Sequence, residues 1–337
     1  MVLPKKITEK SALNLIHTSS PVGKEDMKDF MKSMAKLAKI FKNITVFDVK
    51  RTELDPRYLA GSTKERLSKF RQAIKKVDWL APIYGGTGCE DIVRKLTSQD
   101  LARIRKNRPV VNGFSDTTFL INFLYFKLKM ISFHYSSIAG MSLLDNNKLF
   151  FDAIGGKINS FSFLEKDYEW LSDKAPENKI EGIAIGGNLS TFRDLLDISD
   201  IKIRSWKPYV LFIEEVDEDM ENLHRIVSAL DEKGIFKSIK ALVIGKITGK
   251  MYENDFRITF KKLNLVFGKY EDKPEHVFEY LLSGVIKERI KQNNPLHILK
   301  ANNLGHGVTR NAMLVPIGAK TTIYPDKKIE FIGPFVK

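Results

Sequence analysis

The chain has a single cysteine and no long apolar run. Cys89 stands alone among 337 residues, which excludes an internal disulfide framework and a cysteine-rich metal site. No stretch approaches the roughly 18 apolar residues of a membrane helix, and Met1–Lys10 is polar and basic, unlike a signal peptide. The H-E-x-x-H pattern of zinc peptidases is missing too. We therefore expect a cytoplasmic protein that needs no membrane, metal or other cofactor.

Charge is plentiful and mostly basic, but it does not form a nucleic-acid signature. The 55 lysines and arginines exceed the 41 acidic residues by 14, and the lysines occur in ones and twos along the chain. No arginine-rich run, zinc-finger spacing or aromatic–basic sheet motif accompanies them. We interpret the excess as a lysine-rich solvated surface and expect no nucleic-acid partner.

The order of apolar segments predicts an α/β fold. With 337 residues, 43% of them hydrophobic, the chain is long enough for two domains with sizeable cores. Short apolar runs alternate with helical patterns in the first part of the chain, which predicts a mostly parallel sheet with helices on both faces. This rhythm is lost over 146–179 and then resumes. We expect an N-terminal α/β domain over 1–145, a linker with some local structure over 146–179 and a C-terminal domain over 180–337.

A serine stands at the most informative junction of the sequence. The apolar run Pro109–Asn112 leads through Gly113 to Ser115, and a helical pattern of apolar residues begins at Asp116. A hydroxyl at a strand–helix junction lies beside free backbone N–H groups and the positive end of the helix dipole, as in a nucleophile elbow. Thr117 replaces the last glycine of the usual G-x-S-x-G elbow. The alternative that Ser115 only caps the helix therefore stays open.

Two further side chains can be combined with Ser115 in a serine-hydrolase site. A serine nucleophile needs a histidine base, and the histidine needs a carboxylate that fixes its tautomer. His306, between two glycines, is the candidate base. Glu214, at the end of an apolar strand pattern, is the candidate acid; its neighbour Glu215 is the weaker candidate and fits a structural role better.

Glycine turns and one strand-end histidine supply the remaining candidates. The backbone N–H groups of Gly86 and Asp116 would form the oxyanion hole. Gly85, Asn188 and His134 are candidate substrate-binding residues, because the crevice of a parallel sheet opens where its strands end. The simpler alternatives are a plain turn at each glycine pair and a buried, hydrogen-bonded histidine.

Five short motifs occur in a fixed order along nearly the whole chain. They are Gly85-Gly86-Thr87-Gly88, Gly113-Phe114-Ser115-Asp116-Thr117-Thr118, Gly186-Gly187-Asn188-Leu189, Leu211-Phe212-Ile213-Glu214-Glu215 and Gly305-His306. In this order they resemble the LD-carboxypeptidase family of serine peptidases, which also includes the microcin C self-immunity proteins. The resemblance implies an N-terminal α/β nucleophile domain, a C-terminal domain with barrel-like strands, and a triad of Ser115, Glu214 and His306.

The resemblance also implies an activity. Such enzymes remove the terminal D-alanine of a cytoplasmic muropeptide after an L-centre, from L-lysine or diaminopimelate, during cell-wall recycling. One alternative is an amidase that cleaves aminoacyl-nucleotide antibiotics, as in microcin C immunity; another is a non-catalytic ligand-binding homologue. We expect a small peptide or muropeptide substrate, a basic groove for its carboxylates, and a homodimer.

Three departures from the family pattern concern the pocket. Tyr84 stands where the family has arginine, and Thr87 stands where it has tyrosine. His134-Tyr135-Ser136 replaces the family's His-Gly-Pro. Because none of these changes touches the triad, they bear on the substrate more than on the reaction.

Overall fold

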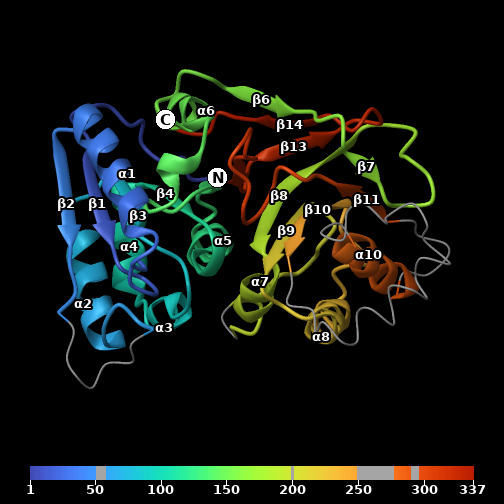
Figure 1. Cartoon of the computed structure of the whole chain (residues 1–337), viewed down its shortest axis with the longest axis horizontal. Helices are drawn as coiled ribbons and strands as arrows, with labels where there is room; N and C mark the ends of the chain where they lie inside the picture. Colours follow the sequence, from blue (N-terminus) through green and yellow to red (C-terminus); the bar gives the residue numbers. More distant parts are fainter. Residues whose placement is uncertain (51–57, 199–200, 249–276, 290–295) are drawn as a thin grey trace.

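The computed structural model describes residues 1–50, 58–198, 201–248, 277–289 and 296–337. Within these residues the strands form two sheets, which lie in two halves of the molecule (Figure 1). The first is six-stranded, in the order β12-β5-β4-β3-β1-β2, and the second is eight-stranded, in the order β6-β14-β13-β8-β9-β10-β11-β7. No helix in these ranges is both long and apolar enough to cross a membrane.

The first sheet is built by the predicted alternation of strands and helices. Its first five strands are parallel and β12 pairs antiparallel at one edge. The strands are β1 (Ala12–Ile16), β2 (Asn43–Phe47), β3 (Trp79–Pro82), β4 (Val110–Gly113), β5 (Ser132–His134) and β12 (Val315–Ile317). The helices are α1 (Met27–Ile40), α2 (Thr63–Ala73), α3 (Cys89–Val93), α4 (Ser98–Asn107) and α5 (Thr118–Leu128). Strands β3 to β5 are buried throughout, because helices or the second half cover both faces. The predicted N-terminal α/β architecture is confirmed.

The second sheet is mixed and curls into a half-barrel (Figure 1). Its parallel centre consists of β8 (Ile180–Asn188), β9 (Tyr209–Val216), β10 (Ala241–Thr248) and β11 (His297–Lys300). Antiparallel strands extend it on both sides: β13 (Lys320–Ile323), β14 (Ile329–Ile332), β6 (Ser160–Phe163) and β7 (Glu169–Trp170). The helices of this half are α7 (Leu189–Leu195), α8 (Met220–Glu232) and α10 (Val277–Arg289). The predicted barrel-like character of these strands is confirmed.

The segment predicted as a linker carries regular structure. Residues 146–179 contain α6 (Asn147–Ile154) and the edge strands β6 and β7, which pair with β14 and β11 of the second sheet. Conversely, β12 of the C-terminal part belongs to the first sheet. The chain therefore crosses between the halves more than once, and the division at 145 and 180 stays a prediction.

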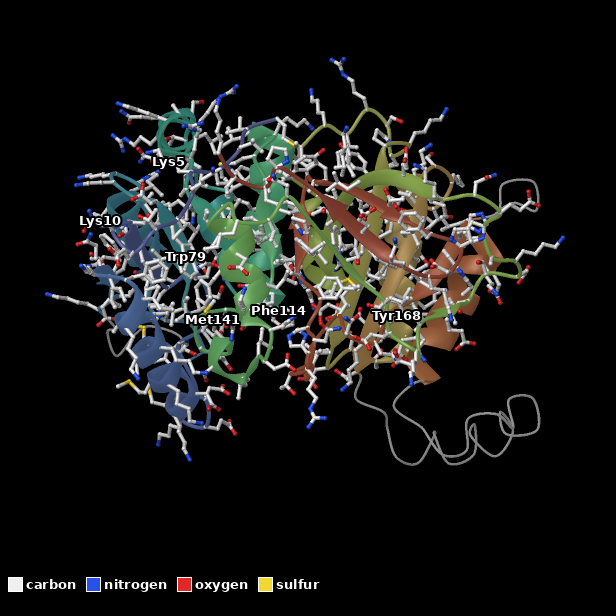
Figure 2. All side chains as sticks on the ribbon, turned by 90° about the horizontal axis from the view of Figure 1, so that it is seen from above. Lys5, Lys10, Trp79, Phe114, Met141 and Tyr168 are labelled. Atoms are coloured by element: carbon white, nitrogen blue, oxygen red, sulfur yellow. The ribbon has the colours of Figure 1, made fainter. Side chains whose placement is uncertain are left out.

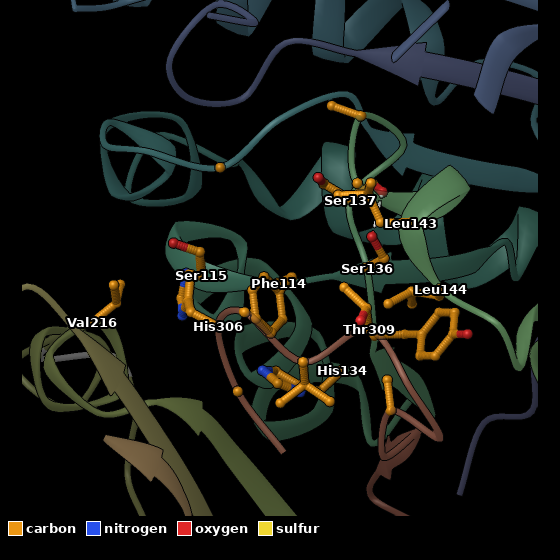
Figure 3. Close-up of a pocket in the computed structure, with 18 of the residues that line it drawn as sticks. Phe114, Ser115, His134, Ser136, Ser137, Leu143, Leu144, Val216, His306 and Thr309 are labelled. Atoms are coloured by element: carbon orange, nitrogen blue, oxygen red, sulfur yellow. Dashed lines mark hydrogen bonds between the residues drawn. The ribbon is translucent and has the colours of Figure 1, made fainter. Parts of the chain in front are cut away.

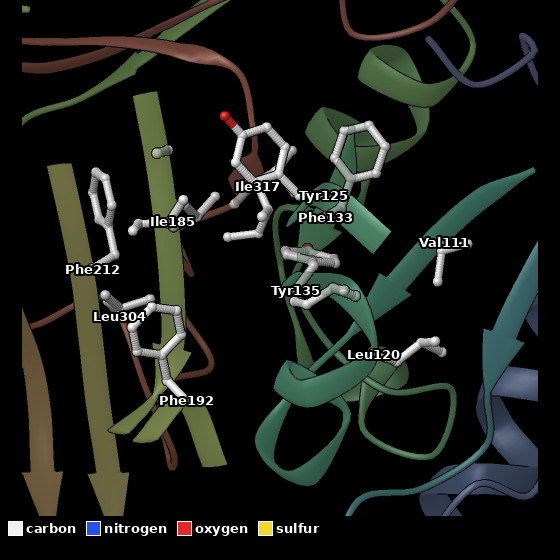
Figure 4. Close-up of a cluster of buried hydrophobic side chains, with 14 of the residues drawn as sticks. Val111, Leu120, Tyr125, Phe133, Tyr135, Ile185, Phe192, Phe212, Leu304 and Ile317 are labelled. Atoms are coloured by element: carbon white, nitrogen blue, oxygen red, sulfur yellow. The ribbon is translucent and has the colours of Figure 1, made fainter. Parts of the chain in front are cut away.

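Helix α5 joins the two halves. It is apolar around its circumference and is buried from Thr118 to Tyr125, as such a helix must be. Figure 4 shows Tyr125 and Ile317 beside Ile185 of β8. In Figure 2, Phe114 lies between Trp79 of the first half and Tyr168 of the second. Helix α5 itself contacts β4 and β5 of the first sheet and β8 of the second.

Candidate active site

Ser115 lies on a tight elbow between β4 and α5. Its backbone φ of 56° is left-handed, an uncommon conformation for a residue other than glycine. Ser115 opens a short 3-10 turn that ends at Thr117, so α5 itself begins at Thr118 rather than at the predicted Asp116. The turn is held by Thr117, whose Oγ1 accepts from Phe114 N at 2.6 Å and donates to Phe114 O at 2.8 Å. The threonine that departs from the usual elbow therefore stabilises it.

The glycine turn after β3 faces this elbow. A Cβ on Gly85 would lie 3.0 Å from Ser115 Cβ and 3.3 Å from its Oγ. Gly86 has φ 98°, and a Cβ there would clash with Ser20 Oγ. Among the described residues, the Gly86 N–H donates no backbone hydrogen bond outside the helices and strands. The N–H of Asp116 lies in the first turn of a helix, where backbone N–H groups have no acceptor within the helix. Two donors beside Ser115 therefore remain available.

The side chain of Asp116 has a structural task. Its carboxylate accepts from Cys89 N at 2.9 Å, which ties the elbow to the start of α3. Burial raises the pKa of this carboxyl to about 6. Burial also raises the pKa of the Cys89 thiol well above its usual range, as expected for a packed cysteine.

His306 and Glu214 form a buried pair contributed by the second half. Nδ1 of His306 lies 2.6 Å from Oε2 of Glu214, whose side chain is fully buried, while 23% of the His306 side chain is exposed. Burial opposes ionisation of Glu214, but the charge and hydrogen bond of His306 outweigh it and lower its pKa. For His306, burial favours the neutral ring, yet the Glu214 carboxylate raises the pKa above its ordinary value.

Ser115 and His306 line one cavity of about 440 Å³ (Figure 3). In Figure 3 the serine lies next to the imidazole, and Phe114 lies on the other side of the ring. The ring centroids of Phe114 and His306 are 4.5 Å apart, so the residue before the serine also packs on the histidine. Among the described residues, no hydrogen bond joins Ser115 Oγ to His306. The cavity draws on both halves of the chain.

His134 also lines the cavity, next to the Glu214–His306 pair. It is 1% exposed, and its Nε2 lies 4.0 Å from Oε1 of Glu214. Neither ring nitrogen, nor that carboxylate oxygen, has a hydrogen-bond partner in the described part of the chain. Burial lowers the pKa of His134 to about 4, so the ring is neutral at physiological pH. Gly187 leaves room for it, because a Cβ there would meet His134 Cδ2 at 2.6 Å.

Asn188 is not brought to the cavity. Its Oδ1 accepts from Thr191 N at 3.1 Å and caps α7, while its Nδ2 donates to Glu215 Oε1 at 2.6 Å. Glu215 Oε2 accepts from Ser190 N at 2.7 Å. Burial raises the pKa of Glu215 to about 6. This network gives Glu215 a structural role and does not favour substrate contact by Asn188.

The charged residues that line the cavity are acidic. Asp26, Asp29 and Asp217 belong to the lining, and Asp26 accepts a 2.5 Å hydrogen bond from Tyr84. No lysine or arginine is among the described lining residues, so the expected basic groove is not found there. Asp26 and Asp29 could not be predicted as lining residues from the sequence, because nothing local connects the start of α1 with Ser115. Within the described ranges no three His, Cys, Asp or Glu side chains are grouped as metal ligands would be.

The fold is α/β, and one cavity is lined by Ser115 of the first half and His306 of the second. The LD-carboxypeptidase N-terminal domain model matches residues 13–135, and the C-terminal domain model matches 181–323. These two matches span more than half of the chain. The chain belongs to the LD-carboxypeptidase family.

Curated relatives match more distantly. The chain is 24% identical over 221 residues to the microcin C7 self-immunity protein MccF of Escherichia coli, covering 56% of this chain and 62% of the relative. It is 27% identical over 185 residues to a Bacillus subtilis protein named "Probable murein peptide carboxypeptidase", covering 52% and 55%. The match spans less than two thirds of the length of either relative.

Solved structures share the fold over the whole chain. MccF in complex with glutamyl sulfamoyl guanosine superposes with a TM-score of 0.76 at 18% identity, covering 100% of both chains. A muramoyltetrapeptide carboxypeptidase from Oxalobacter formigenes gives 0.71 at 20% identity, covering 97% of this chain and 100% of the other. At these identities the likeness establishes the architecture.

Proposed function

We propose that the protein is a serine LD-carboxypeptidase, which hydrolyses the amide bond between an L-centre and the terminal D-amino acid of a muropeptide. The observation that carries the proposal is the 2.6 Å Glu214–His306 pair, which shares a cavity with a serine on a left-handed elbow. Membership of the LD-carboxypeptidase family supports the reaction class.

In the acylation step, Oγ of Ser115 attacks the carbonyl carbon and Nε2 of His306 takes the hydroxyl proton. The C–N bond then breaks, and His306 returns the proton to the leaving amine of the D-amino acid. In deacylation a water attacks the ester carbon and gives its proton to His306, which passes it to Ser115 Oγ as the C–O bond breaks. Glu214 accepts the Nδ1–H and stabilises the imidazolium formed in both steps.

The tetrahedral intermediates carry a negative oxygen that needs donors. The N–H groups of Gly86 and Asp116 are proposed for this role, because both flank Ser115 and are available. The hydrogen bond from Ser115 to His306 is proposed to close as substrate binds, since catalytic hydrogen bonds are often long in free enzymes. The pocket around Ser115 is otherwise preorganised by Thr117 and by the glycine turn.

The experiment offers two substrates to the purified protein. One is a muropeptide ending in L-Lys–D-Ala, and the other is an aspartyl sulfamoyl adenosine amide; products are separated by mass spectrometry. The proposal is supported if the wild-type protein releases D-alanine and the Ser115→Ala variant does not. Ser137→Ala is the matched control, because Ser137 lines the same cavity without a proposed role, and it should lose less than about tenfold.

Two other outcomes would replace the proposal. Cleavage of the sulfamoyl adenosine amide alone would make the protein an immunity-type amidase. Binding without cleavage of either compound would make it a non-catalytic homologue. The cytoplasmic location, the role in wall recycling and the homodimer stay predictions.

A further inference from the structure

The proposed substrate poses an electrostatic problem that the cavity lining does not solve. A terminal D-amino acid carries a free carboxylate, yet the charged residues lining the cavity are Asp26, Asp29 and Asp217. A carboxylate is repelled by such a lining unless a cation or N–H donors meet it. An exopeptidase of this kind therefore needs a cation or a set of N–H donors close to His306, where the leaving group departs.

Lys246 is held next to the histidine loop by a break in β10. The pairing of β10 with β9 shifts register between Ile244 and Ile247, and Lys246 lies at this irregularity. Bulges of this type re-aim side chains beside active sites. The backbone N–H of Lys246 donates to Leu304 O at 2.6 Å, which ties the bulge to the segment that carries His306.

The two glycines around His306 leave space for this lysine. A Cβ on Gly305 would lie 3.0 Å from Lys246 O and 3.2 Å from Lys246 Cβ. At Gly307 the single heavy atom within 4 Å of a Cβ would be Lys246 Nζ, at 3.3 Å. Gly305 and Gly307 both line the cavity, so the ammonium lies directly against its wall.

The charge of Lys246 is available to a ligand. The side chain is partly buried, and among the described residues its ammonium makes no hydrogen bond or ion pair. The carboxylate of Glu279 in α10 lies at the same strand, where its Oε1 accepts from Ile247 N at 3.0 Å. Burial raises the pKa of Glu279, and the charges of Lys300 and Lys246 oppose that rise.

We propose that Lys246 binds the terminal carboxylate of the substrate and so makes the enzyme a carboxypeptidase rather than an endopeptidase. The inference rests on the proposed function for the identity of the substrate. The long lysine side chain brings the ammonium beside Gly307, the residue that follows His306. The substrate class is accordingly a peptide with a free C-terminal carboxylate, and a peptide amide is a poor ligand.

The test measures binding in the Ser115→Ala background, so that it does not depend on turnover. Calorimetry compares a muropeptide ending in L-Lys–D-Ala with the same peptide ending in D-alaninamide. We expect the acid to bind roughly 10- to 100-fold more tightly, the range of a charge-assisted contact. Adding Lys246→Met should abolish this preference, and Lys246→Arg should retain most of it.

Arg310→Met is the matched control. Arg310 is an exposed cation that follows the cavity residue Thr309, and it should leave the acid-over-amide preference unchanged. A preference that survives Lys246→Met, or that disappears with Arg310→Met, overturns the proposal. If Lys246→Met lowers the stability of the protein but leaves the preference for the acid over the amide unchanged, Lys246 has a structural role as the partner of Glu279 instead.

The same measurement separates this inference from the proposed function. If the preference for the acid depends on Lys246 but the wild-type protein releases no D-alanine, the proposed carboxylate site is supported and the proposed hydrolase activity is contradicted. If the wild-type protein and Lys246→Met release D-alanine with equal efficiency, the proposed hydrolase activity is supported and the proposed carboxylate site is contradicted.

Discussion

Nδ1 of His306 lies 2.6 Å from Oε2 of the fully buried Glu214. This contact fixes the proton on Nδ1 and leaves Nε2 as the basic nitrogen of the ring. Because Phe114 packs on the same imidazole at 4.5 Å, the ring is held between the acid and the serine elbow. The orientation of the proposed base is therefore set before any substrate arrives.

Removing either the nucleophile or the base should abolish turnover. Ser115→Ala and His306→Ala should each lower kcat by about 10⁴-fold or more, since neither residue works without the other. The double variant should be little worse than either single variant. Steady-state release of D-alanine measures all three, and losses that multiply in the double variant would show that the two side chains do not act together.

The pH profile should carry the signature of the Glu214–His306 pair. His306 accepts a proton only when it is neutral, so kcat/KM falls as the pH drops through its pKa. Because the Glu214 carboxylate raises that pKa, the acid limb should lie above the ordinary histidine value of about 6.5.

Glu214→Gln provides the comparison. It removes the charge, so it should move the limb to lower pH and lower kcat by about 10⁴-fold. An acid limb that does not move in this variant would show that another group titrates.

Glu215 should matter for folding rather than for chemistry. Oε1 accepts from Asn188 Nδ2 and Val216 N, and Oε2 accepts from Ser190 N. Glu215→Gln replaces one of these acceptor oxygens by an amide NH₂, which cannot accept a hydrogen bond and leaves a buried N–H donor without a partner. This should lower the free energy of unfolding by about 1–3 kcal/mol. Urea unfolding measures this loss. Glu221→Gln, at a side chain that is 84% exposed, should change stability by less than about 0.5 kcal/mol.

Gly85→Ala should displace the nucleophile. The added methyl group would lie 3.0 Å from Ser115 Cβ, and a displacement of about 1 Å can cost about 100-fold in rate. We expect kcat to fall by this order while the protein stays folded. Gly284→Ala is the control, because nothing lies within 4 Å of a Cβ there. Full activity of Gly85→Ala would show that the close approach of the turn is not needed.

The sequence predicts those parts of the site that local geometry determines. Ser115 is recognisable because a strand, a tight turn and a helix follow one another, and the parallel first sheet follows from the same alternation. The motif around Asn188 misleads, because its side chain caps α7 instead of facing the cavity. Lys246 and Asp26 could not be predicted, since a strand irregularity and the packing of α1 bring them to the site from distant parts of the chain.

We propose Ser115 as the nucleophile of a metal-independent LD-carboxypeptidase. The most direct test measures D-alanine released from a muropeptide ending in L-Lys–D-Ala, with EDTA present, by the wild-type protein and by Ser115→Ala. We expect release by the wild-type protein and none above background by the variant. Equal release by both proteins, or inactivation by EDTA that zinc restores, would contradict it.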